Sequence, residues 1–517
     1  MRKAFKACVL AFVSMFAGFV AYAQVTTAAL GGRVADSNGE SIPGATVVAV
    51  HTPSGSQYYG LTNEEGRYSI NGMRSGGPYS IEVSCLGFQK VTYTDVTLLL
   101  GEVFALNASL SDDAELLNEA VVISSAASKF ATEKTGAATN INSSQIESLP
   151  TISRDLTDLT RLSPYGGNKM TFMGADARSS NFTIDGANFN DNFGLNNGDL
   201  PGGGNPVSMD AIEELQVVIS PFDVRQTNFI GGGVNAITKS GTNTLKGSAY
   251  VYHENEFMRG NSVNGLNLGD RAENRTTTYG MTLGGPIIKN KLFYFVNFEY
   301  IPHPKVVSYW RPSTDGVANP DLNISRTTVE DMKKVKDYLK EKYGYETGGY
   351  EGFNGNDMTL KALARIDWNI TDSHHLSFRY NYTTAKEYMG PNATSSDAKT
   401  RALYSRMSQY SMAFQNSTYN YDNLVHSFSL DLNSRLSDNM QNQFLATFSK
   451  LDTTRDTPSE YFPFIDILDG TGPETPYMAV GYELFSWLNG YHNNVLNIKD
   501  DFTLYKGNHK ITAGLAY

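Results

Sequence analysis

The feature that most constrains this chain is a series of strands, each about ten residues long, in which apolar and polar side chains alternate. In the segment 291–300, every second residue from Leu292 to Tyr300 is apolar or aromatic, and the other face includes Asn297 and Glu299. Successive side chains of a strand point to opposite faces of a sheet. The pattern therefore predicts strands with one apolar face and one polar face. A soluble sandwich and an outer-membrane β-barrel both satisfy it.

The alternation recurs down the second half of the chain, and the connections between the segments differ in length. Short connections lie at Asn290 and 371–375, and long ones cover 302–359, 386–422 and 452–494. Outer-membrane barrels have short turns on the periplasmic side and long loops outside the cell. The further alternating segments are 362–370, 376–383, 424–433, 443–450, 497–505 and 510–517.

The start of the chain has the pattern of a secretory signal. Three cations (Arg2, Lys3 and Lys6) precede an apolar run, and the A-x-A rule predicts cleavage after Ala23, which makes Gln24 the new N-terminus. Residues 1–23 contain no acid, so their removal changes the net charge from −11 to −14. Nucleic-acid binding requires clustered Lys and Arg, and this balance argues against it.

Composition supports the barrel over the sandwich. Tyr (30) and Phe (27) far outnumber Trp (3) and Cys (2), and the chain contains 47 Gly. Aromatic girdles and Gly-rich turns give such a profile. A mean hydropathy of −0.32 is too polar for a helical membrane protein.

Residues 24–111 read as a small β-sandwich. About seven short strands are separated by turn signals such as Asn38-Gly39 and Pro43-Gly44. This spacing is typical of an immunoglobulin-like or transthyretin-like sandwich. The segments G-R-V-A-D-S-N-G-E-S-I-P-G-A-T-V-V, T-N-E-E-G-R-Y-S-I and Y-S-I-E-V-S-C-L-G-F resemble the carboxypeptidase-regulatory-like domain, which is not catalytic.

Residues 112–128 form a linker with one short β-branched run. A run of this kind, flanked by small polar residues, is a free strand that can add to the sheet edge of a partner. An ordinary linker with an apolar patch is the alternative. Because of its position before a plug-like module, the run resembles the TonB box of TonB-dependent outer-membrane receptors. The residues of the TonB-box-like run are Glu119, Ala120, Val121, Val122, Ile123 and Ser124.

Residues 129–240 read as a mixed α/β module. We expect a helix at 143–147, capped by Ser143 or Ser144 with Glu147 completing a capping box, and a second helix at 154–162. A strand ending in I-D-G, an A-I-E-E-L-Q-V-V element after a cap at Ser208 or Asp210, and G-G-G-V-N-A-I-T-K-S-G follow in this order. The order resembles the plug of a TonB-dependent receptor.

The stretch 229–255 joins that module to the first aromatic strand. Its glycines mark backbone that needs either a positive φ or a close approach to a neighbour. Residues 241–517 then form the predicted barrel segment, whose G-G-P-I-I-K-N-K-L-F-Y-F-V-N-F-E-Y resembles the Oar-like and glycan-importing branches of these receptors. The junction residues are Gly231, Gly232, Gly233, Lys239 and Gly241.

No catalytic motif is recognisable, and we predict neither an enzyme nor a cofactor. The pair His253 and Glu256 has an H-x-x-E spacing, but residues i and i+3 of a strand face opposite sides, so no metal site is expected there. The first long loop contains a helix candidate at 329–342, capped by Thr328. The plug loop that we expect to face a ligand includes Phe189, Asn190, Asp191, Asn192 and Asp199.

The sequence therefore predicts a mainly β chain: an N-terminal transthyretin- or immunoglobulin-like β-sandwich, an α/β plug, and the first part of an antiparallel outer-membrane β-barrel. We count about nine barrel strands. A plugged lumen goes with about 22 strands, so we expect an N-terminal fragment of a longer receptor, although the last segment ends in an aromatic, Tyr517, as a final strand would.

The resemblance implies a receptor in the cell outer membrane that imports a glycan, peptide or chelate, with its N-terminal domains in the periplasm. TonB would pair by strand addition, lipid would surround the barrel, and a surface lipoprotein is a further candidate partner. Two alternatives remain open. One is a structural or adhesive outer-membrane protein without energy coupling, and the other is a secreted carbohydrate-binding β-protein.

Overall fold

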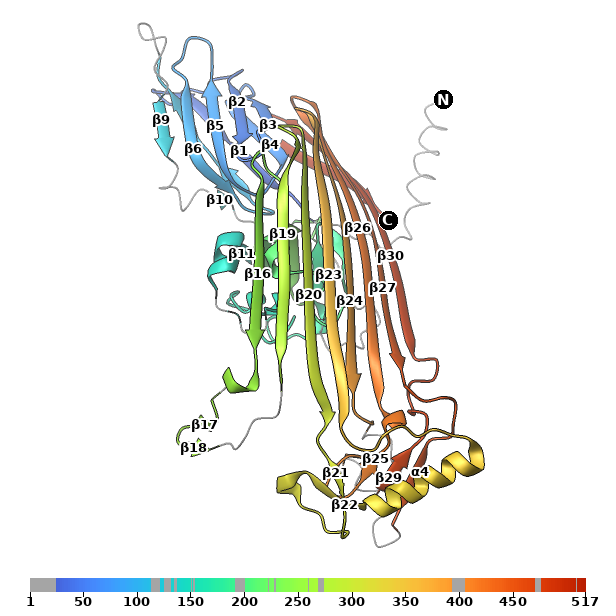
Figure 1. Cartoon of the computed structure of the whole chain (residues 1–517). Coiled ribbons are helices and arrows are strands. Elements are labelled where there is room, and N and C mark those ends of the chain that lie inside the picture. The colour runs from blue at the N-terminus through green and yellow to red at the C-terminus, as the bar shows by residue number, and fades with distance from the viewer. Residues whose placement is uncertain are drawn as a thin grey trace, which may run out of the picture.

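The computed structural model describes residues 25–112, 121–124, 132–133, 137–149, 151, 154–190, 200–221, 223–226, 229–258, 260–267, 274–392, 405–469, 476–507 and 509–517. Three parts follow one another along the chain: a sandwich (25–112), a plug module (137–238) and a barrel sheet (246–517). Figure 1 shows the sandwich in blue at one end of the long barrel strands, with the plug module beside those strands. Within the described residues, no helix has the length and apolarity to cross a membrane.

The sandwich consists of two sheets packed around an apolar core, as predicted. The linker contributes β9 to the first sheet, and the start of the segment predicted as the α/β module contributes β10 to the second. The sheet β3-β2-β5-β6-β9 packs on the sheet β10-β7-β1-β4, and β8 pairs with β1. Alternate residues of strands such as β2, β3 and β5 are buried, and Leu30, Val47 and Ile81 are fully buried. The strands are β1 (Ala28–Asp36), β2 (Thr46–His51), β3 (Ser56–Leu61), β4 (Arg67–Met73), β5 (Gly76–Ser84), β6 (Val91–Leu98), β7 (Val103–Ala105), β8 (Ala108–Leu110), β9 (Val121–Ser124) and β10 (Thr132–Glu133).

The plug module is a five-stranded sheet with short helices. The strand order is β11-β14-β15-β12-β13, with β12 and β15 parallel. Almost every residue of β14 and β15 is buried, which is the pattern of strands covered on both faces. The elements are β11 (Ala137–Asn142), α2 (Ser143–Ser148), α3 (Leu156–Thr160), η2 (Ala177–Ser179), β12 (Asn181–Ile184), β13 (Ala187–Asn188), η3 (Met209–Ala211), β14 (Ile212–Ile219) and β15 (Gly233–Thr238).

Two expected helix starts in the plug module need correction. The cap of α2 is Asn142, which forms a capping box with Gln145, instead of Ser143 or Ser144 with Glu147. Asn is as good a cap as Ser, and the register here places it one residue earlier. The second helix is shorter than 154–162 because Asp155 caps it at Leu156. Ser208 caps η3 as expected.

Within the described residues, the barrel sheet has nine antiparallel strands in the order of the sequence: β16-β19-β20-β23-β24-β26-β27-β30-β31. Several strands are much longer than the predicted ten residues. The expected loop 302–359 is partly strand, since β20 and β23 remain paired as far as Ser308 and Phe353. The strands are β16 (Lys246–Glu254), β19 (Thr276–Ile288), β20 (Leu292–Ser308), β23 (Phe353–Thr371), β24 (His374–Met389), β26 (Tyr419–Ser437), β27 (Met440–Asp456), β30 (Gly490–Lys506) and β31 (His509–Ala516).

The two faces of the barrel sheet have the polarity of a membrane barrel and not that of a soluble sandwich. On β24, Arg379, Asn381 and Thr383 are at most 2 % exposed, whereas Phe378 on the other face is 40 % exposed. Buried polar residues thus face the plug module, and exposed aromatic residues face outward, where lipid surrounds a barrel. This inversion contradicts the alternative of a secreted soluble β-protein.

The long loops form a structured layer beyond the strand ends. The helix α4 (Val329–Tyr343) is capped by the Thr328 side chain and ends at Gly344 with a φ of 65°, as predicted. It packs with the sheet β25-β29-β28 around buried residues such as Met332 and Phe414, and it also lies close to β21 and β22. The other elements outside the barrel sheet are η4 (Glu256–Met258), β17 (Ser262–Val263), β18 (Leu266–Asn267), β21 (Arg311–Ser313), η5 (Pro320–Leu322), β22 (Ile324–Thr328), β25 (Met412–Ala413), η6 (Gln415–Ser417), β28 (Ile465–Leu468) and β29 (Pro476–Val480).

Candidate functional site

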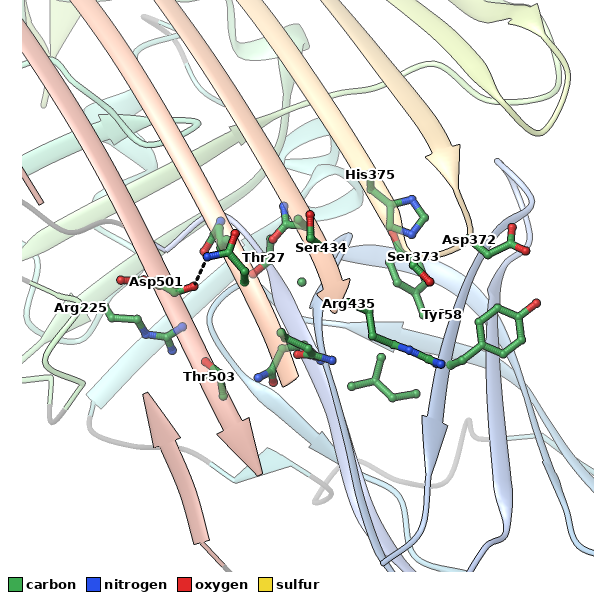
Figure 2. Close-up of a pocket in the computed structure, with 18 residues that line it drawn as sticks. Thr27, Tyr58, Arg225, Asp372, Ser373, His375, Ser434, Arg435, Asp501 and Thr503 are labelled. Carbon is green, nitrogen blue, oxygen red and sulfur yellow. Dashed lines mark hydrogen bonds between the residues drawn. The ribbon is translucent and has the colours of Figure 1, made fainter. Parts of the chain in front are cut away.

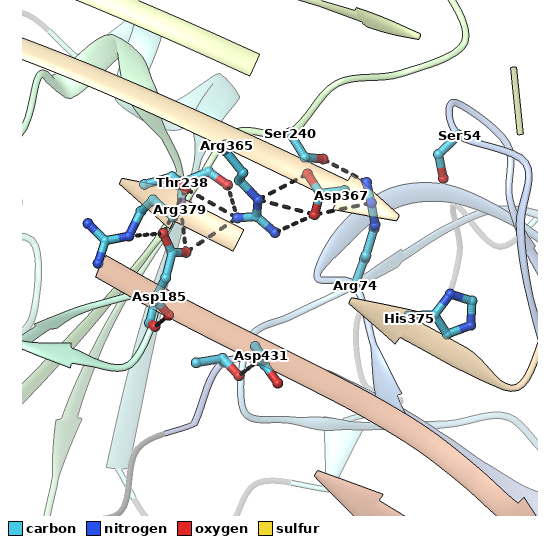
Figure 3. Close-up of polar contacts among 12 residues, drawn as sticks. Ser54, Arg74, Asp185, Thr238, Ser240, Arg365, Asp367, His375, Arg379 and Asp431 are labelled. Atoms are coloured by element: carbon cyan, nitrogen blue, oxygen red, sulfur yellow. Dashed lines mark hydrogen bonds and ion pairs between the residues drawn. The ribbon is translucent and has the colours of Figure 1, made fainter. Parts of the chain in front are cut away.

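A chain of alternating charges joins the three parts of the molecule (Figure 3). Its centre is Asp185, in the turn between β12 and β13 of the plug module. One carboxylate oxygen lies 3.3 Å from Arg365 Nη1, and the other lies 3.0 Å from Arg379 Nε. The backbone N–H and the hydroxyl of Thr238 also donate to this carboxylate, at 3.0 and 2.7 Å. Two barrel strands therefore hold one plug turn.

The chain of charges continues from the barrel into the sandwich. Arg365 lies beside Asp367 on the same face of β23, with Nη2 2.9 Å from Oδ1. Arg74 of the sandwich places its Nη2 3.2 Å from the same oxygen, and its Nη1 donates to Ser240 Oγ at 2.7 Å. The Asp367 carboxylate is 3 % exposed. Charge-assisted pairs of this kind are strong where water is excluded, provided that each charge has a partner.

The local sequence explains why Asp185 can occupy this turn. Asp185 has a φ of 45° and Gly186 a φ of 77°, and this left-handed region is open to Gly and tolerated by Asp and Asn. A Cβ at Gly186 would come within 2.6 Å of the Leu445 side chain on the barrel wall. The I-D-G motif thus combines a tight turn with a close approach to the barrel.

A second contact joins the sandwich to the plug module. Glu214 of β14 is 1 % exposed. Its carboxylate accepts hydrogen bonds from the Ser75 hydroxyl at 2.6 Å, the Leu100 N–H at 3.0 Å and the Asn140 side-chain amide at 2.7 Å. Burial raises the pKa of this carboxyl, and the hydrogen bonds oppose that shift. Glu214 therefore links the plug strand to the turn of the sandwich that precedes β7.

The sandwich also lies on the short turns of the barrel. Ser56 Oγ is 2.9 Å from the Asn369 side-chain amide at the β23–β24 turn. The ring of Tyr58 lies 4.7 Å from the ring of His375 on the other side of that turn. At the β19–β20 turn, a Cβ on Gly55 would lie 2.3 Å from Asn290 Oδ1. Two neighbouring turns are therefore in contact with β3 and the residue before it.

The same surface of the sandwich reaches the two remaining hairpins. The N–H of Asn71 donates to Gln441 Oε1 at 3.1 Å, just beyond the β26–β27 turn. The Asn63 side-chain amide donates to the Gly507 carbonyl at 3.1 Å, in the β30–β31 turn. Figure 2 shows a cavity where the parts meet, lined by Tyr58 of the sandwich, Arg225 of the plug module and polar barrel residues.

Of the predicted junction residues, Gly231 and Gly232 precede β15 and Gly233 is its first residue, whereas Lys239 and Gly241 lie between β15 and β16. Of the two predicted alternatives, the structure shows a close approach and no positive φ at the triple glycine. A Cβ at Gly232 would lie 2.5 Å from the Phe172 ring, and a Cβ at Gly233 would lie 2.7 Å from the Phe229 ring. A Cβ at Gly241 would lie 2.3 Å from the Tyr294 carbonyl oxygen of the barrel. Lys239 pairs with Glu147 at 2.9 Å.

The TonB-box-like run is only partly described. Glu119 and Ala120 lie outside the described residues, as do Ala23 and Gln24 of the signal cleavage site. Val121–Ser124 form β9, which pairs in parallel with β6 from Val91 to Thr94. The run is therefore a strand, and in this structure it lies on the edge of the sandwich.

The plug loop has a structural role where it is described. Phe189 is fully buried and lies 6.4 Å from the Phe182 ring. Asn190 accepts a hydrogen bond from the Phe182 N–H at 2.7 Å. Both residues hold the plug core in this structure. Asp191, Asn192 and Asp199 lie outside the described residues. Where the structure describes the chain, no three His, Cys, Asp or Glu residues are placed to hold a metal.

The sequence did not identify Arg74, Asp185, Glu214 or Asp367 as a connected set. The signal present was the alternation itself, which places charged residues such as Arg365 and Asp367 on the lumen face of a membrane strand. Charges at such positions are expensive unless paired. Their partners come from parts far away in the sequence, and the pattern does not specify those.

Comparison with known proteins agrees with this architecture. A model of the carboxypeptidase regulatory-like domain matches residues 29–111, and a model of the outer membrane beta barrel domain matches residues 237–312 and 333–517. The TonB-dependent transporter Oar of Myxococcus xanthus is 23 % identical over 393 residues, which cover 71 % of this chain and 34 % of Oar.

Two solved structures are also among the matches. The siderophore receptor PirA from Acinetobacter baumannii has 16 % identity and a TM-score of 0.45, and the outer membrane transporter YddB from Escherichia coli has 12 % identity and a TM-score of 0.48. Each match covers 73 % of this chain and 47 % of the other. The chain thus spans about a third of Oar and about half of either receptor.

Proposed function

We propose, from the premise that this chain belongs to the outer membrane beta barrel domain family, that it works as a TonB-dependent receptor. It would import a nutrient ligand (a glycan, peptide or chelate) across the outer membrane, where the chain resides, into the periplasm. The relatives that match support transport, since one is a TonB-dependent transporter by name.

The observation that carries the proposal is the contact of Asp185 with Arg365 and Arg379. A module with its own sheet lies against the polar face of the barrel sheet, and charged pairs help to fasten it there. Such pairs have discrete alternative partners, including water, so the module can be displaced without unfolding the barrel. A plug of this kind closes a lumen at rest and opens when force moves it.

The run 119–124 is the proposed point at which the force enters. An extended strand offers its backbone N–H and C=O groups to the sheet edge of a partner. The described part of the run already forms a parallel strand on β6, which supports its ability to pair. In the proposal, the periplasmic domain of TonB takes this strand and pulls.

The test is binding of the purified periplasmic domain of TonB to the full-length receptor. Val122→Pro removes a backbone N–H from the run, and Val122→Ala keeps it, so the pair separates strand addition from side-chain recognition. We expect the proline variant to lose binding by at least tenfold, which corresponds to about 1.4 kcal/mol, and the alanine variant to bind within about twofold. Equal binding by all three proteins would contradict the proposal.

A second candidate function is a structural or adhesive role at the cell surface. It is favoured by the loop layer, where α4 and the sheet β25-β29-β28 share a core. An adhesive protein needs no energy coupling. Its phenotype would survive Val122→Pro, whereas import would not.

A further inference from the structure

The sandwich has two opposite edges that are both occupied. In the first sheet, β3 and β9 are the outermost strands, at opposite ends of the order β3-β2-β5-β6-β9. In the second sheet, β4 and β10 are the outermost strands in the same way. Figure 1 shows β3 and β4 toward the barrel strands and β9 on the far side. The barrel turns therefore cover one edge, and β9 and β10 form the other.

The chain is attached to the sandwich at β9 and again at β10 before it reaches the first plug strand. The strand β9 pairs with β6 over four residue pairs from Val91↔Val121 to Thr94↔Ser124. Further along, β10 pairs with β7 through Thr132↔Phe104 and Glu133↔Val103. The first plug strand begins only at Ala137. A pull on the run 121–124 consequently loads the sandwich before it loads the plug module.

The contact of the barrel with the plug module differs in kind from its contact with the sandwich. The plug module shares an apolar core with the barrel wall, since Phe295, Leu363 and Val425 belong to the same buried cluster as plug residues. The apolar cluster of the sandwich contains only residues of the sandwich itself. Across the described sandwich–barrel contact, the interactions are hydrogen bonds such as Ser56–Asn369, ring contacts, and the Arg74–Asp367 pair.

This difference determines which of the two contacts breaks first. Apolar burial is the dominant favourable term in association, whereas water can replace each partner of a polar contact. The cavity between the sandwich and the turns is lined by polar groups such as Asp372, Ser434 and Asp501 (Figure 2). Water therefore already has room at this joint. The joint between sandwich and barrel is the weaker of the two.

We infer that the sandwich is a periplasmic cap on the transport path. It bridges the β19–β20, β23–β24, β26–β27 and β30–β31 turns, and a pull on β9 lifts it from these turns before the plug module moves. This function rests on the proposed import only in that TonB supplies the pull. The cap adds a gate on the exit side, so that ligand leaves the lumen only after the sandwich has undocked.

The test is single-molecule force measurement on the full-length receptor in a supported bilayer. A biotin-acceptor peptide inserted directly after Ser124 provides the handle. In the Cys85→Ser background, Ser56→Cys with Asn369→Cys is bridged by a reducible bis-thiosulfonate reagent, which fixes the cap to the β23–β24 turn. The control bridge, Ser248→Cys with Thr282→Cys, joins neighbouring barrel strands whose hydroxyls are 2.7 Å apart and leaves the cap free.

We expect two events in the unbridged protein: a short extension at low force when the cap undocks, and a long extension when the plug module leaves. The cap bridge should abolish the first event and reduction should restore it, while the control bridge should leave both. The inference is overturned if the first event persists in the bridged protein, or if the plug module leaves first. Neither TonB nor a nutrient is present in this measurement. A negative result therefore contradicts the cap and leaves the import proposal untouched, and a failure to observe import does not affect the force result.

Discussion

Arg74 of the sandwich lies 3.2 Å from Asp367 of the barrel strand β23, and both side chains are largely shielded from water. The pair belongs to a chain in which Arg379, Asp185, Arg365, Asp367 and Arg74 alternate in charge. Barrel, plug module and sandwich thus share one electrostatic unit. A change at one end alters the partners available at the other.

Arg74→Met should loosen the sandwich without unfolding it. The methionine keeps an unbranched apolar stem but leaves the Asp367 carboxylate without one of its two cations, and breaking a buried pair costs about 3–5 kcal/mol. Because Arg365 remains beside Asp367, we expect the lower end of that range. Hydrogen exchange at the β23–β24 turn should accelerate.

The matched control is Lys90→Met. Its partner Glu82 lies at 3.0 Å, but both side chains are exposed, at 48 % and 40 %, and exposed pairs contribute little. Equal protection of the turn in the Arg74→Met and Lys90→Met proteins would show that the sandwich does not depend on the buried pair.

Glu214 should tolerate Gln and reject Leu. A glutamine can accept from the Leu100 N–H with its carbonyl and donate to the Ser75 hydroxyl with its amide, and it removes a carboxyl whose pKa burial raises. Leucine cannot accept a hydrogen bond, so the Leu100 N–H and the Asn140 amide each lose an acceptor. Each unsatisfied group lowers the free energy of unfolding by about 1–3 kcal/mol. Exchange of the Leu100 amide proton reports on this contact directly, and fast exchange in Glu214→Gln would refute the account.

His51 should make the stability of the sandwich depend on pH. Burial, and secondarily the nearby Arg74, lower the pKa of this imidazole from 6.5 to about 3, while Asp367 opposes the shift. The unfolded chain binds a proton below about pH 6.5 and the folded chain does not. The contribution of His51 to the free energy of unfolding is therefore fully present above pH 6.5. It falls as the pH drops toward 3, by at most about 1.4 kcal/mol per pH unit.

Urea titrations between pH 7 and pH 4.5, read by proteolysis of the released sandwich, measure this slope. His51→Gln should flatten it, and His492→Gln, at a side chain that is 64 % exposed, should not. An unchanged slope in the His51→Gln protein would assign the pH dependence to other groups.

Gly241→Ala should impair barrel assembly. Its Cβ would lie 2.3 Å from the Tyr294 carbonyl oxygen and 2.8 Å from that of Gly285, so backbone must shift, at about 1–3 kcal/mol or more. Gly260→Ala is the control, because a Cβ there meets nothing within 4 Å. The heat-shifted mobility of the folded barrel on gels should be lost in part only for Gly241→Ala.

Much of the fold could be predicted because its periodicities are local. Alternation marked the barrel strands, and the Thr328 cap with Gly344 marked α4 at nearly its observed bounds. The strands extend further than predicted because partners such as β20 and β23 continue to pair beyond the membrane thickness. Their sequence there, including Pro302 and Pro304, carries no strand signal.

The site could be predicted only in part, because its members meet across the fold. The I-D-G motif drew attention to the turn that contains Asp185, but its charge partners lie on β23 and β24. The run 119–124 was predicted to be a free strand. Its described part pairs with β6, and the sequence of the run alone does not indicate this partner. Phe189 was expected in a plug loop that faces a ligand, yet its ring is fully buried in a core that the sequence does not display.

The central claim is energy-coupled import, and the most direct measurement separates ligand binding from uptake. Cells that produce full-length receptor, or receptor lacking residues 119–124, are compared for growth on a panel of glycans, peptides and metal chelates, with and without TonB. Surface display is measured by antibody on intact cells. We predict that one nutrient supports growth only with the intact run and with TonB, while display and ligand binding stay equal. Growth on that nutrient that is unchanged by deletion of the run would contradict the account.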